Sequence, residues 1–241
     1  MNIIRVKDYN KMSQVASSYI IELLNRLASP VLGLATGATV EGLYSILVDE
    51  CKKGIVSFKN VKTFNLDEYV NVDHNHPTSY HYYMNKRLFD HVDIRNDNVH
   101  LPNSNSENLE AECQEYEAKI LQAGKIDVQV LGIGINGHIG FNEPGTPFTS
   151  RTHVVKLEES TRKANSRFFP SIDDVPTHAI TMGIGTILES REILLLVSGK
   201  QKADTLKRLL HGEISEDFPA SILHKHSNVT VIADTDASLN L

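Results

Sequence analysis

Two adjacent carboxylates, Asp67 and Glu68, stand at the end of the apolar run 61–66. Neighbouring residues of an extended chain point to opposite sides, so one of the two can face a ligand while the other faces the sheet. A carboxyl group in a partly desolvated pocket has a raised pKa and can carry a proton near neutral pH. The pair therefore indicates a proton carrier or, in the simpler interpretation, a solvated turn.

A glycine-rich loop follows the apolar run 128–133 and holds one histidine and one glutamate. The sequence from Leu131 to Gly145 places His138 five residues before Glu143. The imidazole can accept and donate a proton near pH 7, and a carboxylate beside it can orient it and stabilise its charged form. An isolated histidine is more often structural, but a glycine-rich loop after a buried strand favours a role in acid–base chemistry.

The segment Thr36-Gly37-Ala38-Thr39 joins the apolar run 31–35 to a helical pattern, and we expect Thr39 to cap that helix. Small residues at a helix start let backbone N–H groups approach an anion, and the helix dipole adds to the attraction. Neither a Walker A nor a GxGxxG pattern is present. The segment is therefore either a phosphate-binding loop or a tight turn before a capped helix.

Two cations further along the chain could complete an anion site. Arg167 lies among apolar neighbours in the segment 165–169, and Lys202 opens a helix after the apolar run 192–197. Each of them alone is typical of a solvated surface charge. Together with the loop at residues 36–39, however, they could hold a phosphate group from three sides.

Three histidines, His74, His76 and His81, invite a metal interpretation. Their spacing matches no strong metal signature, and Pro77 starts a helix in the middle of the group. Zinc sites usually present their ligands at regular short spacings on two neighbouring elements. We therefore expect no metal site.

The elements that would position these groups alternate between short apolar runs and longer amphipathic segments. Several runs carry Val, Ile and Leu on both faces, as expected of parallel strands covered by helices. This alternation predicts an α/β fold: a doubly wound, mostly parallel, Rossmann-like sheet with helices on both faces, which binds ligands beyond the carboxyl ends of its strands. The predicted strands span residues 3–6, 31–35, 61–66, 98–101, 128–133, 152–157, 192–197 and 229–233. The predicted helices span residues 12–28, 39–51, 78–91, 106–123, 158–169 and 202–210.

The composition limits the class of protein. The chain has 241 residues and a net charge of −6, from 24 basic and 30 acidic residues, which argues against broad binding of nucleic acid. Its longest dense apolar stretch, 193–197, is far too short to cross a membrane. With only two cysteines and no export signal, we expect a cytoplasmic protein. We also expect one domain over residues 1–241, with residues 144–175 as a candidate mobile flap.

Taken together, these motifs resemble the glucosamine-6-phosphate deaminase family over essentially the whole chain. The related 6-phosphogluconolactonases share the fold but lack the combination of Asp-Glu-Tyr and Phe-Asn-Glu-Pro that is found here. Five segments carry the resemblance in the family's order: Leu-Ala-Thr-Gly-Ala-Thr at 34–39, Phe-Asn-Leu-Asp-Glu-Tyr at 64–69, Gly-Ile-Asn-Gly-His-Ile-Gly-Phe-Asn-Glu-Pro at 134–144, Ala-Asn-Ser-Arg-Phe-Phe at 164–169 and Gln-Lys-Ala at 201–203.

The resemblance implies the conversion of D-glucosamine 6-phosphate and water to D-fructose 6-phosphate and ammonia, without a metal or organic cofactor. It implies that Asp67 takes the proton from C2 and passes it towards C1, with Glu68 as a structural or orienting neighbour. It assigns ring opening to His138, supported by Glu143 and by the residue at position 136. The substrate phosphate would be bound by Thr36, Gly37, Ala38, Thr39, Arg167 and Lys202.

The chain departs from the family pattern in several places. Asn136 stands where many members have Asp, and an amide cannot take up a proton near pH 7, so we expect Asn136 only to orient the ring-opening groups. Ala38 replaces a common Gly or Ser and offers no hydroxyl group. The larger hexameric members, which N-acetylglucosamine 6-phosphate activates, have an Arg-x-Lys where this chain has His153 and Val155, and a longer C-terminal segment. We therefore expect a short, non-allosteric form, either a monomer or a homodimer.

Three other functions stay open. A lactonase acting on 6-phosphogluconolactone would use the same fold but would release no ammonia. A catalytically silent sugar-phosphate sensor, such as the effector module of a transcriptional regulator, would need a DNA-binding segment, and none is evident. A scaffold protein would not need Asp67, His138 and Glu143 in one crevice. We favour the deaminase, which binds a small-molecule substrate and neither nucleic acid nor membrane.

Overall fold

A seven-stranded parallel sheet forms the centre of the molecule, which confirms the predicted parallel architecture. The computed structural model describes residues 1–166 and 169–241. The strands of this sheet are β1 (Asn2–Val6), β2 (Val31–Leu34), β3 (Lys62–Asn65), β5 (Val99–His100), β6 (Val128–Leu131), β9 (Glu192–Val197) and β10 (Val229–Asp234). Their order is β1-β10-β9-β6-β2-β3-β5, and all neighbours are parallel. From β2 the chain continues outwards through β3 to β5. It then returns to β6, beside β2, and continues in the opposite direction through β9 to β10. In such sheets a ligand crevice forms where the order reverses.

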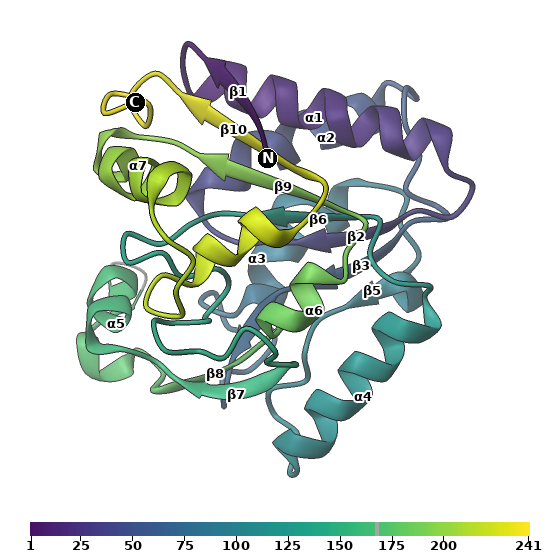
Figure 1. Cartoon of the computed structure of the whole chain (residues 1–241). Helices are drawn as coiled ribbons and strands as arrows, with labels where there is room; N and C mark the ends of the chain where they lie inside the picture. The colour runs from purple at the N-terminus through teal and green to yellow at the C-terminus, as the bar shows by residue number, and fades with distance from the viewer. Residues whose placement is uncertain (167–168) are drawn as a thin grey trace.

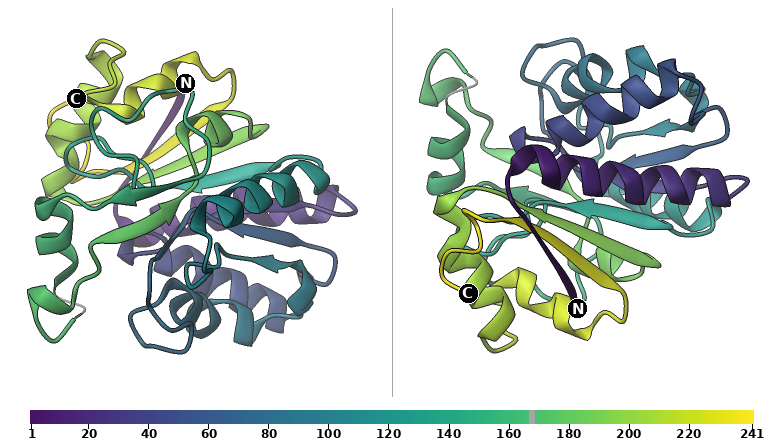
Figure 2. Two further views of the ribbon diagram at one scale, coloured as in Figure 1. Left: turned by 90° about the horizontal axis from the view of Figure 1, so that it is seen from below. Right: turned by 90° about the horizontal axis from the view of Figure 1, so that it is seen from above.

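Helices cover both faces of this sheet, which explains why its inner strands are apolar on both sides. The helices are α1 (Tyr9–Arg26), α2 (Ala38–Lys52), α3 (Tyr80–Arg87), α4 (Leu109–Gln122), α5 (Glu159–Asn165), α6 (Ile184–Leu188) and α7 (Ala203–His211). α1 packs against α2 on one face, and α4 lies on the opposite face (Figure 1 and Figure 2). Every residue of β2, β6 and β10 is buried. Each fully buried Val, Leu or Ile side chain contributes about 1.5–3 kcal/mol to folding, so these strands anchor the loops that follow them.

Side-chain caps fix the starts of two long helices. Asp8 accepts a hydrogen bond from the backbone N–H of Lys11 (2.7 Å) before α1, and Asn108 accepts one from Ala111 (3.0 Å) before α4. Both helices start within three residues of their predicted positions. α6 and the 3₁₀ helix η6 (Pro219–Lys225) were not predicted, because they are too short for a helical period to show. None of the described helices is both long enough and apolar enough to cross a membrane.

A second, antiparallel sheet was not predicted. Its strands are β4 (Asp67–Tyr69), β8 (His178–Thr181) and β7 (His153–Lys156), in the order β4-β8-β7. Leu66 joins the two sheets: its N–H donates to the carbonyl of Leu34 (2.9 Å), and its carbonyl accepts from the N–H of Met182 (2.6 Å). The predicted run 61–66 therefore continues directly into β4. The run 152–157 is a strand, as predicted, but it belongs to this second sheet.

Candidate active site

Four neighbouring strands of the main sheet bring the predicted site residues to one edge. β9, β6, β2 and β3 are consecutive in the sheet, and parallel neighbours lie about 4.8 Å apart. Their carboxyl ends lead to Lys202, to the loop with His138, to residues 36–39 and to Asp67, in that order. Segments that are up to 166 residues apart in sequence, from Thr36 to Lys202, thus meet along a single edge, where the strand order reverses between β6 and β2.

Asp67 is the first residue of β4 and is almost completely buried, with 7% of its surface exposed. Burial raises the pKa of its carboxyl group to about 8, and the negative charge of the neighbouring Glu68 adds to this rise. A carboxyl group with such a pKa can take up and release a proton near neutral pH. That property is required of a group that carries a proton from one carbon atom to the next.

Alternation along β4 turns the neighbouring Glu68 away from Asp67. The Glu68 side chain is fully buried. It accepts hydrogen bonds from the backbone N–H groups of Tyr69 (2.8 Å), Tyr80 (2.9 Å) and His81 (2.9 Å), and from Nδ1 of His81 (2.8 Å). Two of these N–H groups start α3, where the helix dipole favours a carboxylate. Glu68 therefore ties β4 to α3.

The loop after β6 brings Asn136, His138 and Glu143 together. Nδ1 of His138 lies 3.4 Å from Oε2 of Glu143, an ion-pair distance that lacks the alignment of a hydrogen bond. Asn136 bridges the two residues: its Nδ2 donates to Oε2 of Glu143 (2.7 Å), and its Oδ1 accepts from the backbone N–H of His138 (3.2 Å). Thr161 of α5 donates to the other carboxylate oxygen of Glu143.

These contacts set the charge of Glu143. Burial alone would raise the pKa of its carboxyl group, but the contacts with His138, Thr161 and Asn136 outweigh burial and hold the pKa below its ordinary value. The side chain of His138 is 26% exposed, whereas that of Glu143 is 6% exposed. The result is an accessible imidazole backed by a buried carboxylate, which is the arrangement of a base and its orienting group.

Gly140 lets this loop lie against Asp67. The φ angle of Gly140 is +59°, and a Cβ atom there would lie 2.8 Å from Oγ1 of Thr181 and 3.6 Å from Oδ2 of Asp67. The next residue, Phe141, donates its backbone N–H to the same hydroxyl group of Thr181 (3.0 Å). Asp67 and the loop that carries His138 therefore form adjoining walls of one site.

The loop at residues 36–39 differs from its prediction in one respect, because Gly37 and not Thr39 is the cap of α2. The φ angle of Gly37 is +99°, a conformation that favours glycine, and the helix consequently starts at Ala38. Among the described residues, no side chain caps this start. The carbonyl groups of Gly37 and Ala38 are held by the hydroxyl groups of Tyr83 (2.9 Å) and Tyr9 (2.8 Å). The N–H of Val40 bonds to the carbonyl of Gly37 (3.3 Å), so the N–H groups of Ala38 and Thr39 are the ones at this start that could bind an anion.

Lys202 ends the 3₁₀ helix η5 (Lys200–Lys202) just beyond β9, and it is half-buried whereas Lys200 is exposed. Burial lowers the pKa of the Lys202 ammonium group. In the part of the chain that the structure describes, no carboxylate pairs with this ammonium group. A half-buried cation without a partner favours an anionic ligand. Arg167, the other predicted cation, lies outside the described residues.

The histidines that we considered as metal ligands have other contacts. Nδ1 of His76 lies 2.7 Å from the hydroxyl group of Thr78. The rings of His74 and His81 stack with their centroids 3.8 Å apart. Over residues 1–166 and 169–241, no group of three or more His, Cys, Asp and Glu side chains is arranged to hold a metal ion.

Comparison with known proteins decides the family. The family model described as glucosamine-6-phosphate isomerases/6-phosphogluconolactonase matches residues 7–232. The chain belongs to this family. It is 58% identical over 237 residues to a glucosamine-6-phosphate deaminase of Oceanobacillus iheyensis, which covers 98% of this chain and 95% of that protein. It is 52% identical over 238 residues to glucosamine-6-phosphate deaminase 1 of Bacillus subtilis, over 99% of this chain and 98% of that protein.

Solved structures share the family's fold. A structure described as a monomeric glucosamine-6-phosphate deaminase matches with a TM-score of 0.98 at 51% identity and covers 100% of both chains. A 6-phosphogluconolactonase from Thermotoga maritima matches with a TM-score of 0.76 at 20% identity, over 97% of this chain and 99% of that chain. The match to the lactonase shows a common fold only, whereas the match to the deaminase includes similarity of the amino-acid sequence.

Sequence reasoning missed two threonines at the family's predicted site. Thr161 reaches Glu143 from α5, and Thr181 pairs with Asp67 across the second sheet and lies beside Gly140. A threonine in a helical or strand pattern carries no signal of this kind. Gly140 is one of several glycines in the loop, so the sequence did not single it out. Its place between His138 and Glu143 could have indicated close contact of the loop with another part of the site.

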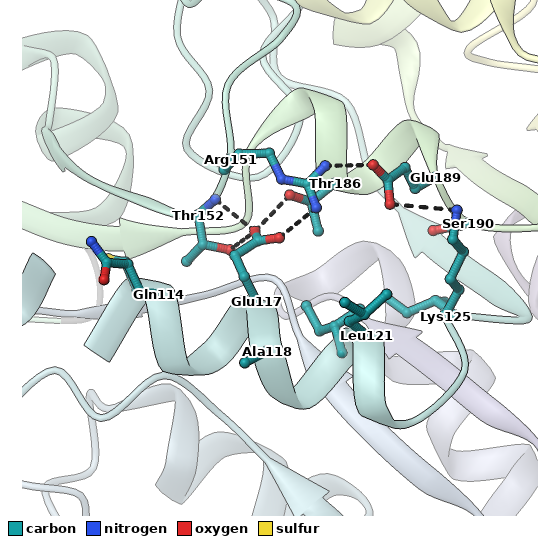
Figure 3. Close-up of a pocket in the computed structure, with 13 residues that line it drawn as sticks. Gln114, Glu117, Ala118, Leu121, Lys125, Arg151, Thr152, Thr186, Glu189 and Ser190 are labelled. Carbon is teal, nitrogen blue, oxygen red and sulfur yellow. Dashed lines mark hydrogen bonds and ion pairs between the residues drawn. The ribbon is translucent and has the colours of Figure 1, made fainter. Parts of the chain in front are cut away.

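A separate hollow of about 360 Å³ lies along α4 and α6 (Figure 3). Its charged groups are already paired: Arg151 donates to Glu117 and to Glu189 (2.7 Å each), and Nζ of Lys125 lies 3.6 Å from Glu189. Lys125 and Glu189 stand just before β6 and β9, at the amino ends of the strands. The hollow therefore reaches toward the opposite edge of the sheet and is not where the family's site residues meet.

Proposed function

We propose that the chain is a glucosamine-6-phosphate deaminase, which converts D-glucosamine 6-phosphate and water to D-fructose 6-phosphate and ammonia. One observation carries the proposal: the buried Asp67, whose carboxyl group has a raised pKa, lies against the loop that holds His138 and Glu143. The family and the close relatives that bear this name support it. These acid–base groups suffice for the reaction, so we propose that it needs no metal or organic cofactor.

In the proposed first step, His138 opens the sugar ring. It takes the proton of the C1 hydroxyl group and returns a proton to the ring oxygen as the bond between C1 and that oxygen breaks, which leaves an open-chain aldehyde. The imidazole carries a positive charge between the two transfers, and the ionised Glu143 stabilises that charge. Asn136 holds both residues in place but transfers no proton.

In the proposed second step, Asp67 removes the proton from C2, and a proton of the substrate's ammonium group passes to the aldehyde oxygen, which gives an enolamine. Asp67 then delivers its proton to C1. The C2 carbon becomes an iminium group, which water hydrolyses to the ketone of fructose 6-phosphate with loss of ammonia. A single carboxylate can reach two adjacent carbon atoms, and its raised pKa keeps the proton available for return.

The substrate phosphate is proposed to bind at the start of α2 and at Lys202. The N–H groups near Thr36, Gly37, Ala38 and Thr39 would donate hydrogen bonds, and the dipole of α2 would favour the negative charge. Arg167 stays a predicted third contact, on the family motif alone.

The Lys202→Gln variant is expected to weaken the binding of glucosamine 6-phosphate by roughly 10- to 100-fold, because a charge-assisted hydrogen bond contributes about 1.5–3 kcal/mol. The turnover number should change little, since the phosphate lies away from the reacting carbon atoms. Steady-state kinetics and calorimetry measure the two effects. Lys200→Gln is the matched control: if it weakened binding as much as Lys202→Gln, the phosphate would not be assigned to Lys202.

The fold shared with 6-phosphogluconolactonase makes lactone hydrolysis the second candidate. The two activities are compared with one preparation, by ammonia release from glucosamine 6-phosphate and by acid release from 6-phosphogluconolactone. We expect turnover of the amino sugar and no enzyme-dependent hydrolysis of the lactone. Efficient hydrolysis of the lactone without ammonia release from the amino sugar would replace the proposed function by the second candidate.

The enzyme is proposed to be a non-allosteric monomer or homodimer. His153 and Val155 on β7 replace the basic pair of the activated hexameric members, and a relative described as monomeric matches over its whole length. Addition of N-acetylglucosamine 6-phosphate should therefore leave the substrate saturation curve hyperbolic and its midpoint unchanged. A lowered midpoint would contradict this prediction, and a hexamer in sedimentation equilibrium would contradict the proposed assembly.

We propose a cytoplasmic location, in keeping with two free cysteines and with bacterial relatives of metabolic function. We also propose that residues 1–241 act as one domain in which the described part of the segment 144–175 moves over the site; residues 167–168 of that segment lie outside the described residues. The contact of Thr161 with Glu143 places α5, which belongs to this segment, beside the ring-opening residues.

A further inference from the structure

Glu68, the neighbour of Asp67 on β4, is a buried carboxylate that contacts His81 of α3. Oε2 of Glu68 accepts hydrogen bonds from Nδ1 of His81 (2.8 Å) and from the backbone N–H of His81 (2.9 Å). Glu68 accepts hydrogen bonds from three backbone N–H groups and, as a carboxylate, has no proton to donate, so Nδ1 of His81 is the donor in this contact. The contact thus joins the residue next to Asp67 to an imidazole ring on α3.

Glu68 is the charged residue that acts most directly on Asp67. Its negative charge adds to burial in raising the pKa of the Asp67 carboxyl group. Among the described residues, Tyr44 of α2, Tyr80 of α3 and Tyr116 of α4 also interact electrostatically with Asp67. Burial raises the pKa of each of these hydroxyl groups well above its ordinary value, so they stay neutral near pH 7. The charge behind Asp67 therefore depends on Glu68 and its partner.

The side chain of His81 is 21% exposed and reaches solvent, whereas Glu68 is fully buried. The ring of His74 stacks on that of His81, with an angle of 10° between their planes. Burial, together with the charge of His81, lowers the pKa of His74, against the opposite effect of Glu68 and Asp73. His74 is thus favoured in its neutral form, in which it can stack on a charged imidazole without repulsion.

We propose that Glu68 and His81 are positioning residues that set the proton affinity of Asp67. When His81 is protonated, its charge compensates that of Glu68, and Asp67 releases its proton more easily. When His81 is neutral, the charge of Glu68 is uncompensated, and Asp67 holds its proton more tightly. The inference rests on the proposed function only in giving Asp67 a catalytic role; the electrostatic coupling itself needs no turnover.

Two substitutions at position 81 should move the titration of Asp67 in opposite directions. His81→Asn keeps an N–H donor for Glu68 but removes the titratable charge, so the midpoint should rise. His81→Lys supplies a lasting positive charge, so the midpoint should fall. We expect each shift to be at least about half a pH unit. His76→Asn is the matched control, because His76 is exposed in the same segment and contacts Thr78 instead of Glu68.

The midpoint is measured by carbon-13 NMR of the carboxyl group in protein labelled at aspartate, with Asp67 assigned from the Asp67→Asn spectrum. Opposite shifts in the two His81 variants, and none in the control, are the expected result. An unchanged midpoint in a folded His81 variant would overturn the proposal, and the Lys variant suffices if the Asn variant does not fold. If the wild-type protein shows no deaminase activity, this titration still tests the coupling.

In an active enzyme, the low-pH limb of the kcat/KM profile should move with the NMR midpoint while the KM at optimal pH stays unchanged. This separates a positioning role from a structural one, because a merely destabilised protein would lose activity without a shift of the profile. A profile that stays fixed while the NMR midpoint moves would show that Asp67 is not the group whose ionisation limits turnover. Such a result would remove the catalytic part of the inference.

Discussion

Asp67→Asn is expected to lower kcat by about 10²–10⁴-fold, the range in which a positioned acid–base group contributes. The amide cannot take the C2 proton, so the reaction should stop at the open-chain sugar. Binding of glucosamine 6-phosphate should persist, because the proposed phosphate contacts at the start of α2 and at Lys202 are untouched. Turnover is measured by product formation and binding by calorimetry.

The stability of the variant provides the control. The pKa of Asp67 is raised to about 8 in the folded protein, against about 3.9 for an unfolded chain. Between these values the folded state keeps a proton that the unfolded state has released, so this group makes the protein less stable as the pH rises from about 4 to about 8. Asp67→Asn should therefore lose less stability than wild type over that range. If the variant unfolded at a lower temperature than wild type at pH 8, its loss of activity would be attributed to instability and not to catalysis.

His138→Gln should also lower kcat by about 10²–10⁴-fold, for a different reason. The amide can form hydrogen bonds but cannot carry the proton between the C1 hydroxyl group and the ring oxygen. The closed sugar should bind normally and remain closed. Because the two variants are proposed to block different steps, they can be distinguished by what happens to the sugar anomers.

Ring opening interconverts the α and β anomers of glucosamine 6-phosphate, and NMR exchange spectroscopy follows that interconversion on the enzyme. Asp67→Asn should still catalyse it, since ring opening precedes the step that Asp67 performs. The double variant with His138→Gln should not. Anomer exchange that persists in the double variant would assign ring opening to another group. Loss of the exchange in Asp67→Asn alone would show that Asp67 also takes part in ring opening.

The sequence predicted the central sheet because its inner strands are buried on both faces. β9 is apolar from Ile193 to Val197, and only Gln129 interrupts the apolar residues of β6, so these runs can be recognised without any knowledge of their neighbours. The same rule of parallel sheets, that ligands bind at the carboxyl ends, placed Asp67, His138, residues 36–39 and Lys202 at one edge. Order along the chain was therefore enough to group the site.

The second sheet could not be predicted in the same way. β8 has the sequence His-Ala-Ile-Thr, with only two apolar residues, and it forms because Leu66 and β4 offer it a partner. The run before β4 shows no break, so its division at Leu66 into two strands depends on contacts with Met182 and Leu34. Pairing between distant segments decided both features.

The electrostatic state of the site also depends on distant contacts. The sequence suggested a raised pKa for one of two carboxylates but did not distinguish Asp67 from Glu68 without the family resemblance. The structure distinguishes them, because Glu68 accepts four hydrogen bonds whereas Asp67 is buried beside Thr181 and Gly140. The cap at Gly37 was missed for a local reason: threonine is a common cap, but the positive φ angle of Gly37 started the helix earlier.

The most direct test is to incubate the purified protein with glucosamine 6-phosphate and EDTA, without added cofactor, and to measure ammonia and fructose 6-phosphate in the same samples. We predict that both products form in equal amounts and only with enzyme. Binding of the sugar phosphate without either product would contradict the assignment of a deaminase and indicate a sensor or a ring-opening step disabled by Asn136. Products that appear only after a metal ion is restored would contradict a mechanism that rests on Asp67, His138 and Glu143 alone.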